Sequence, residues 1–202
     1  MGVVAGIRRV GSGSMVEVSL ESGERLRLDE RRLLRQELAP GAALDPAALA
    51  RLRGWQRVDD AERRLLRLLA RRPRSRRQLA QACGRYGLGI EESDALLDRL
   101  ADAGLIDDGA LAGRLVDERH ASGHGRLRIA HDLRRLGIEP ASRCVDDETG
   151  GELARARAEL RRRFGDPRNL DQRGLMRAAG HLGRRGFDSD TVAEALGLDA
   201  GC

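Results

Sequence analysis

The chain has 202 residues, 41% of them hydrophobic, and a formal net charge of +5, which suits a globular protein with a real core. All 37 of its basic residues are arginine, whose planar guanidinium group pairs with phosphates and carboxylates. The absence of a long apolar run and of paired cysteines argues against a membrane-spanning protein and a disulfide scaffold, so we expect a cytoplasmic protein.

The first elements in chain order are strands. Residues 15–20 and 25–28 alternate apolar and polar side chains on either side of a turn signal at residues 21–24. This pattern predicts a β-hairpin with one buried face. The apolar residues at 3–7 predict a third strand before the hairpin.

Short helices are expected next, over residues 30–53. One of them should begin at Asp45, because aspartate followed by proline is typical of a helix N-cap and first turn. We therefore expect residues 1–56 to form an amino-terminal extension, composed of a small β-hairpin and short helices.

From about residue 58 onward the sequence shows only helix signals, with leucines at helical spacing. The helices are expected at residues 61–70, 91–103, 108–122, 125–136, 151–164, 170–185 and 188–196, with one more capped by Ser75 and a short one opened by Pro140. The expected fold class is mainly α: tandem three-helix repeats in a curved array, with the hairpin extension. The repeats are expected at residues 57–107, 108–149 and 150–202.

The strongest sign of a repeat is a glycine followed by a large apolar residue after a basic helix. Gly89, Gly137 and Gly186 fit this description, at spacings of 137 − 89 = 48 and 186 − 137 = 49. A glycine in the left-handed conformation ends a helix and lets the next apolar residue fold back onto it. We expect all three glycines to end helices in this way.

Positive charge is concentrated in one segment of the chain. Residues 63–77 contain eight arginines and no acid, whereas the segments after the repeated glycines are acidic. Matching of charges to helix dipoles explains most of the acids, and the codon usage of a GC-rich genome explains the preference for arginine. Neither explains eight arginines in fifteen residues, which place a positive field over a whole helix pair.

Several ordered stretches of this chain resemble the RecX family of recombination regulators. They are Arg-Arg-Pro-Arg-Ser-Arg-Arg-Gln-Leu at 71–79, Leu-Leu-Asp-Arg-Leu-Ala-Asp-Ala-Gly-Leu-Ile-Asp-Asp at 96–108 and Gly-Arg-Leu-Arg-Ile-Ala-His-Asp-Leu-Arg-Arg-Leu-Gly-Ile at 125–138. The resemblance covers about residues 60–196, and the middle repeat is its most specific part. The amino-terminal extension resembles one that only some members carry.

The resemblance implies a regulator of RecA, the recombinase that exchanges DNA strands. Members of the family bind in the groove of the filament of RecA on single-stranded DNA and limit its activity, in homologous recombination, DNA repair and the SOS response. The expected partners are this filament and single-stranded DNA, with duplex DNA as a further candidate, and the expected state is a monomer.

Arginines are the residues expected to contact DNA phosphates and acidic RecA surfaces. The candidates are Arg71, Arg72, Arg74, Arg76, Arg77, Arg119, Arg126, Arg128, Arg135, Arg161 and Arg162. The alternative is a general arginine-rich DNA-binding module without a specific protein partner. The chain has only four aromatic residues, so base stacking cannot be its main mode of nucleic-acid binding.

Catalytic and metal chemistry find little support in the sequence. His120, His124 and His131 are spaced as zinc ligands can be, but glycines interrupt the helix and no further ligand follows at a firm spacing. Asp107 and Asp108 are better read as helix caps than as a magnesium site. We expect no catalytic residues, no metal, no cofactor and no enzymatic activity.

Overall fold

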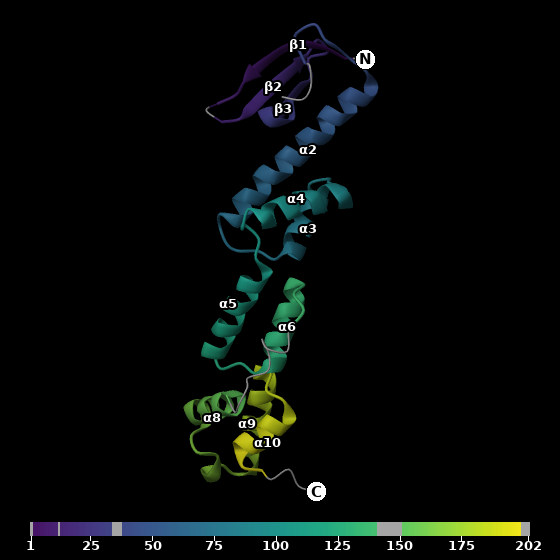
Figure 1. Ribbon diagram of the computed structural model, residues 1–202. Coiled ribbons are helices and arrows are strands. Elements are labelled where there is room, and N and C mark those ends of the chain that lie inside the picture. The colour runs from purple at the N-terminus through teal and green to yellow at the C-terminus, as the bar shows by residue number, and fades with distance from the viewer. Residues whose placement is uncertain (1, 12, 34–37, 141–150, 199–202) are drawn as a thin grey trace. The chain divides into compact units, whose positions relative to one another are not determined.

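The computed structural model describes residues 2–11, 13–33, 38–140 and 151–198 (Figure 1). It is mainly helical with a small amino-terminal sheet, which confirms the predicted fold class. Its two compact units comprise residues 1–73 with 79–105, and residues 74–78 with 106–202. Within the described ranges, none of the helices has the length and apolar character needed to cross a membrane.

The amino-terminal sheet has four antiparallel strands in the order β3-β2-β1-β4. The strands are β1 (Gly2–Arg9), β2 (Met15–Leu20), β3 (Arg25–Asp29) and β4 (Ala43–Leu44). The predicted hairpin and third strand are confirmed. The fourth strand was not predicted, because its two residues are too few to show an alternating pattern. A one-turn helix, α1 (Glu30–Leu33), follows β3.

Helix α2 (Pro46–Leu69) is a single continuous helix. The Asp45 side chain caps it by accepting a hydrogen bond from the Ala48 N–H at 2.6 Å, as predicted. The expectation of a short helix ending near residue 53 and a separate one from residue 61 is wrong. Leu52 and Trp55 pack in the core of the sheet, and Leu65 is also buried, so helix packing continues through the intervening residues. The boundary predicted between residues 56 and 57 falls inside this helix.

The remaining helices begin and end within about two residues of the predicted positions. They are α3 (Arg76–Arg85), α4 (Ile90–Asp102), α5 (Asp108–Ala121), α6 (Arg126–Leu136), α8 (Gly151–Phe164), α9 (Gln172–Arg185) and α10 (Ser189–Leu196). A short 3-10 helix, η1 (Pro167–Asn169), was not predicted. The short helix expected after Pro140 falls on residues outside the described part of the chain.

The last three helices, α8, α9 and α10, pack around a core of their own (Figure 1). The buried residues of this core are Ala156, Leu160, Ala178, Leu182, Phe187, Ala195 and Leu196. A smaller core formed by Ala112, Ile129 and Leu133 joins α5 to α6. The leucines and Ile129 are apolar positions that the helical spacing indicated, whereas the four alanines were not predicted as core residues. Together these residues fix which helix faces remain available to solvent.

Two of the three repeated glycines end helices as predicted. Gly137 and Gly186 have φ of +77° and +87°, and the N–H of the next residue bonds back to Leu133 and Leu182 respectively. The prediction for Gly89 is wrong, because it has φ of −69° and precedes α4. Gly87, with φ of +80°, occupies the left-handed position after α3. The local sequence Gly-Leu-Gly-Ile offers two glycine–apolar pairs, and only the packing of the buried Leu88 selects the first.

The carboxyl end of α9 meets the amino end of α6. The N–H groups of Gly125 and Leu127 donate to the carbonyl oxygens of Arg185 and Gly186, each at 3.0 Å. A helix start has free N–H groups and a helix end has free carbonyl groups, so each end satisfies the other. A Cβ atom on Gly186 would clash with the backbone of Arg128, so this close approach needs glycine.

The carboxyl end of α6 meets the amino end of α3, here through a side-chain hydroxyl instead of backbone N–H groups. The Ser75 hydroxyl donates to the Leu136 carbonyl at 2.6 Å, and a Cβ atom on Gly137 would clash with the side chain of Arg77. Ser75 also accepts from the Gln78 N–H and caps α3, as predicted. The two junctions recur about fifty residues apart, which gives the sequence repeat a structural meaning.

Each junction is closed by a carboxylate from the start of another helix. Asp108 accepts the Arg76 backbone N–H at 2.9 Å, and Glu152 accepts the Arg126 backbone N–H at 2.9 Å. The predicted capping role of the Asp107–Asp108 pair is therefore divided. Asp107 caps its own helix, α5, by accepting from the Ala110 N–H at 2.7 Å, whereas Asp108 caps α3.

Candidate nucleoprotein interface

The arginine at the start of α6 is held by two acids of the third repeat. The Nε of Arg126 lies 3.2 Å from an oxygen of Asp188 and 3.5 Å from one of Glu152. Burial raises the pKa of Asp188, but hydrogen bonds from Thr191 and Arg126 outweigh it and lower this pKa to about 2. Asp188 therefore stays ionised, and its ion pair with Arg126 helps to hold the junction between α6 and α9 together.

A second anchor is the buried Asp132 in the middle of α6. It accepts hydrogen bonds from Arg119 of α5 at 2.7 Å and from Arg128 of its own helix at 3.3 Å. Burial raises the pKa of Asp132, yet the two arginines together hold it below its ordinary value. One carboxylate thus fixes two of the predicted contact residues and ties α5 to α6.

A third anchor is Glu159 of α8, whose side chain is almost fully buried. It accepts from Arg162 at 2.8 Å, lies 2.8 Å from Nε2 of His181 and lies 3.3 Å from Nη2 of Arg185. Burial opposes ionisation, but these three partners lower the pKa of Glu159. Arg185 also donates to the Ser122 carbonyl at 2.7 Å, which connects this anchor to the end of α5.

Nine of the eleven predicted contact arginines fall into two groups. Those that form intramolecular ion pairs are Arg119, Arg126, Arg128 and Arg162. Those that are exposed and form no ion pair with any described residue are Arg71, Arg72, Arg77, Arg135 and Arg161. The second group presents positive charge that the rest of the described chain does not neutralise.

The two other predicted contact residues lie beside the junction between α3 and α6. Arg74 is half-buried. Its Nε atom is buried and has no hydrogen-bond partner among the described residues. Arg76 is half-buried, and its backbone N–H is bonded to Asp108. Both residues precede or open α3, so their side chains depend on the packing of that helix end.

The aromatic residues are all engaged inside the fold. Trp55 packs against the core of the sheet, Phe187 is buried, and the rings of Phe164 and His181 meet edge to face at 5.5 Å between centroids. The guanidinium of Arg64 lies over the Tyr86 ring, 5.1 Å from its centroid. This leaves arginine as the side chain available for contact with a nucleic acid.

The histidines considered as metal ligands do not gather. Among the described residues, no three His, Cys, Asp or Glu side chains form a group that could hold a metal ion. His124 is half-buried, and its Nδ1 has no described hydrogen-bond partner. Burial lowers the pKa of His124, and the nearby charges of Arg185 and Arg119 lower it further.

The three carboxylate anchors were missed by sequence reasoning. Two of their bonds carry a detectable signal, because Arg128 and Asp132 are four residues apart on one helix and Glu159 and Arg162 are three apart. The bonds with basic residues of other helices have no spacing in the sequence that indicates them, and Thr191 bonds to Asp188 as part of a local helix cap.

Comparison with known proteins identifies the family. The model of the second three-helix domain of RecX matches residues 107–142, and the model of the third matches residues 151–196. The protein from Halorhodospira halophila named "Regulatory protein RecX" is 41% identical over 132 residues, which cover 64% of this chain and 82% of that protein. The chain belongs to the RecX family. A protein of the same name from Streptomyces coelicolor is 38% identical over 135 residues, covering 64% of this chain and 72% of that protein.

Solved structures of RecX proteins share this fold. A crystal structure of a regulatory protein RecX matches 98% of the chain and 99% of that chain, with a TM-score of 0.72 and 21% identity. The structure of RecX from Lactobacillus salivarius matches 71% of the chain and 97% of that chain, with a TM-score of 0.57 and 16% identity. The near-complete match to the first structure includes the amino-terminal sheet.

Proposed function

We propose that this protein binds RecA and the filament of RecA on single-stranded DNA, and that it restrains strand exchange in recombinational DNA repair. Membership of the RecX family, whose named relatives are regulatory proteins, is the first support. The proposed mechanism is steric and electrostatic and involves no catalytic step or cofactor. The protein would act in the cytoplasm as a monomer.

The single observation that carries the mechanism is that five of the candidate arginines are exposed and form no ion pair with any described residue. An arginine already paired with a buried carboxylate would have to give up that bond before binding a phosphate. Arg72, Arg135 and the other exposed arginines of this group have no such bond among the described residues. A DNA backbone or an acidic protein surface can therefore neutralise their charge directly. The candidate interface therefore narrows to Arg71, Arg72, Arg77, Arg135 and Arg161.

The experiment compares two double charge reversals. Arg72→Glu with Arg135→Glu removes one exposed arginine from each compact unit. Arg51→Glu with Arg114→Glu makes the same change in net charge at two other exposed arginines, one in each unit, which lie outside the candidate set and outside the three stretches that resemble RecX. We expect the first pair to weaken binding to RecA filaments and inhibition of strand exchange by at least about tenfold. The second pair should leave both within about twofold.

Two results would contradict the proposal. Equal losses in both double variants would mean that net charge, not the selected arginines, determines binding. Equal affinity of the unaltered protein for RecA filaments and for bare single-stranded DNA at physiological salt would favour the general DNA-binding module. Melting curves of both variants are measured alongside, because the exposed positions should change stability by less than about 1 kcal/mol.

A further inference from the structure

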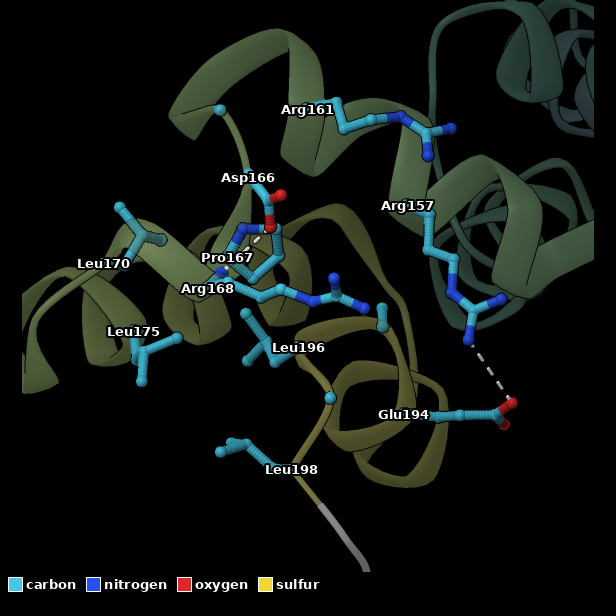
Figure 2. A pocket seen from close by; sticks show the side chains of 13 residues that line it. Arg157, Arg161, Asp166, Pro167, Arg168, Leu170, Leu175, Glu194, Leu196 and Leu198 are labelled. Carbon is cyan, nitrogen blue, oxygen red and sulfur yellow. Dashed lines mark hydrogen bonds and ion pairs between the residues drawn. The ribbon is translucent and has the colours of Figure 1, made fainter.

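The third repeat contains a cleft that shares one residue, Arg161, with the proposed arginine interface. It has a volume of about 940 Å³, within the size range of small ligand sites. Figure 2 shows Arg157 and Arg161 on α8, Arg168 in the segment that follows it, Leu196 at the end of α10 and Leu198 just after that helix. All of its walls come from one compact unit, so the cleft is a property of the repeat itself.

The charged rim of the cleft is predominantly basic. Of its two acids, Asp166 accepts the backbone N–H of Arg168 at 3.0 Å and caps η1, and Glu194 lies 3.7 Å from Arg157. Arg161 and Arg168 are both exposed and form no ion pair with any described residue. Two guanidinium groups at this rim are therefore available to an anionic ligand.

Leucines form an apolar patch in the cleft. Leu170 and Leu175 line it together with Leu196, and these residues belong to or pack against the core of the third repeat. Leu198 adds an apolar side chain that is 47% exposed. An apolar patch with cations at its edge favours a ligand that has an apolar group with negative charges beside it.

We propose that this cleft binds a short acidic segment of a partner protein. An aliphatic side chain of the segment would lie on the leucines, and the flanking aspartate or glutamate carboxylates would meet Arg161 and Arg168. A nucleic-acid strand fits less well. None of the described residues that line the cleft is aromatic, so a base would find no ring to stack on, and the leucine surface offers a phosphate nothing.

This inference goes beyond the proposed function. It assigns a protein-binding site to the third repeat, and it needs neither RecA nor DNA. Its failure is therefore distinguishable from failure of the filament mechanism, because the experiment measures peptide binding by the full-length protein in the absence of both.

The experiment uses fluorescein-labelled peptides and fluorescence anisotropy. The probe is Asp-Glu-Leu-Leu-Asp-Glu, and the comparison peptide is Asp-Glu-Ser-Ser-Asp-Glu, which keeps the charge and loses the apolar group. We expect the leucine peptide to bind at least about tenfold more tightly than the serine peptide. Arg161→Glu with Arg168→Glu should weaken its binding by at least about tenfold, and Leu198→Ser should weaken it by about threefold or more.

The matched control is Arg173→Glu with Arg177→Glu. These two arginines are exposed on α9 of the same unit and do not line the cleft. The control should retain peptide binding within about twofold. The proposal is overturned if both peptides bind alike, if the control loses as much as the cleft variant, or if a short oligothymidylate displaces the leucine peptide and depends on the same cleft residues. Because Leu198 is half exposed, Leu198→Ser tests the apolar part without endangering the fold.

Discussion

Single carboxylates that are buried or half-buried decide what many of the arginines do. Asp132, Glu159 and Asp188 each receive bonds from more than one partner, and basic partners lower the pKa of all three. An arginine that shares such an anchor contributes to the fold, whereas an arginine without one remains available to a partner. The role of each arginine therefore depends on whether a carboxylate lies close enough to pair with it.

Asp188 provides a test of this view through its pH dependence. Its pKa is about 2 in the folded protein and near its ordinary value of 3.8 in the unfolded chain. Its ionisation therefore contributes up to about 2 kcal/mol to stability above about pH 4, and this contribution is lost as the pH falls towards 2. Asp188→Asn should lower the free energy of unfolding by about 1–2 kcal/mol at pH 7, and by progressively less below pH 4. Urea denaturation at several pH values measures both effects.

The control for this change is Asp171→Asn. Asp171 also caps a helix, by accepting from the Gly174 N–H at 2.7 Å, but none of the described arginines is bonded to it. Because asparagine is nearly as good a cap as aspartate, this variant should lose only a few tenths of a kcal/mol. A loss as large as that of Asp188→Asn would mean that capping, not the bond with Arg126, accounts for the stabilisation.

At the scale of elements, the recurring feature is a helix end that stops at glycine and receives the start of another helix. The ends of α9 and α6 both do this, and a carboxylate closes each junction. The glycine meets two separate requirements there, a positive φ and room for the neighbouring backbone or side chain. These junctions explain why the repeat is marked by glycine rather than by a longer motif.

The two requirements can be separated by two glycine substitutions. Gly186→Ala introduces strain at a positive φ and a clash with the start of α6, so we expect a loss of about 2–4 kcal/mol. Gly197→Ala introduces the same kind of strain at φ of +69° with nothing within 4 Å, so a loss of about 1 kcal/mol is expected. Thermal or urea unfolding measures the difference, and equal losses would show that the junction tolerates a methyl group.

At the scale of the whole molecule, positive charge is spread over both compact units instead of being gathered in one site. The net charge of +5 is modest for a chain with 37 arginines, because its 32 acids neutralise most of them. Binding that depends on a few unneutralised arginines should be selective and sensitive to salt. The division into the extension and three repeats at 57–107, 108–149 and 150–202 stays a prediction.

Salt dependence measures how many arginines meet phosphates. Each phosphate contact with single-stranded DNA releases about 0.7 counterion, so the logarithm of the affinity for oligothymidylate should fall linearly with the logarithm of salt concentration. Arg72→Glu with Arg135→Glu should make this slope shallower by the amount that corresponds to about one to two phosphate contacts. Arg51→Glu with Arg114→Glu should leave the slope unchanged. A flat response of the unaltered protein would remove DNA phosphates from the mechanism.

The sequence alone determined the mainly helical fold, the hairpin, most helix boundaries and the family resemblance. These follow from short-range patterns, such as leucines at helical spacing, Asp45 and Ser75 as caps, and ordered motifs. It also showed that arginine is the residue type available for binding. It could not show that α2 is continuous or that Gly87 rather than Gly89 ends α3, because both depend on buried contacts of the surrounding residues.

Only the tertiary structure separated the arginines that stabilise the fold from those left for a partner. Arg119 and Asp132 are 13 residues apart, and Arg126 and Asp188 are 62 apart, yet each pair forms an ion pair. The cleft of the third repeat likewise combines side chains from α8, η1 and α10. An ion pair or a cleft depends on distances in space, and packing of the helices sets those distances for residues that lie far apart along the chain.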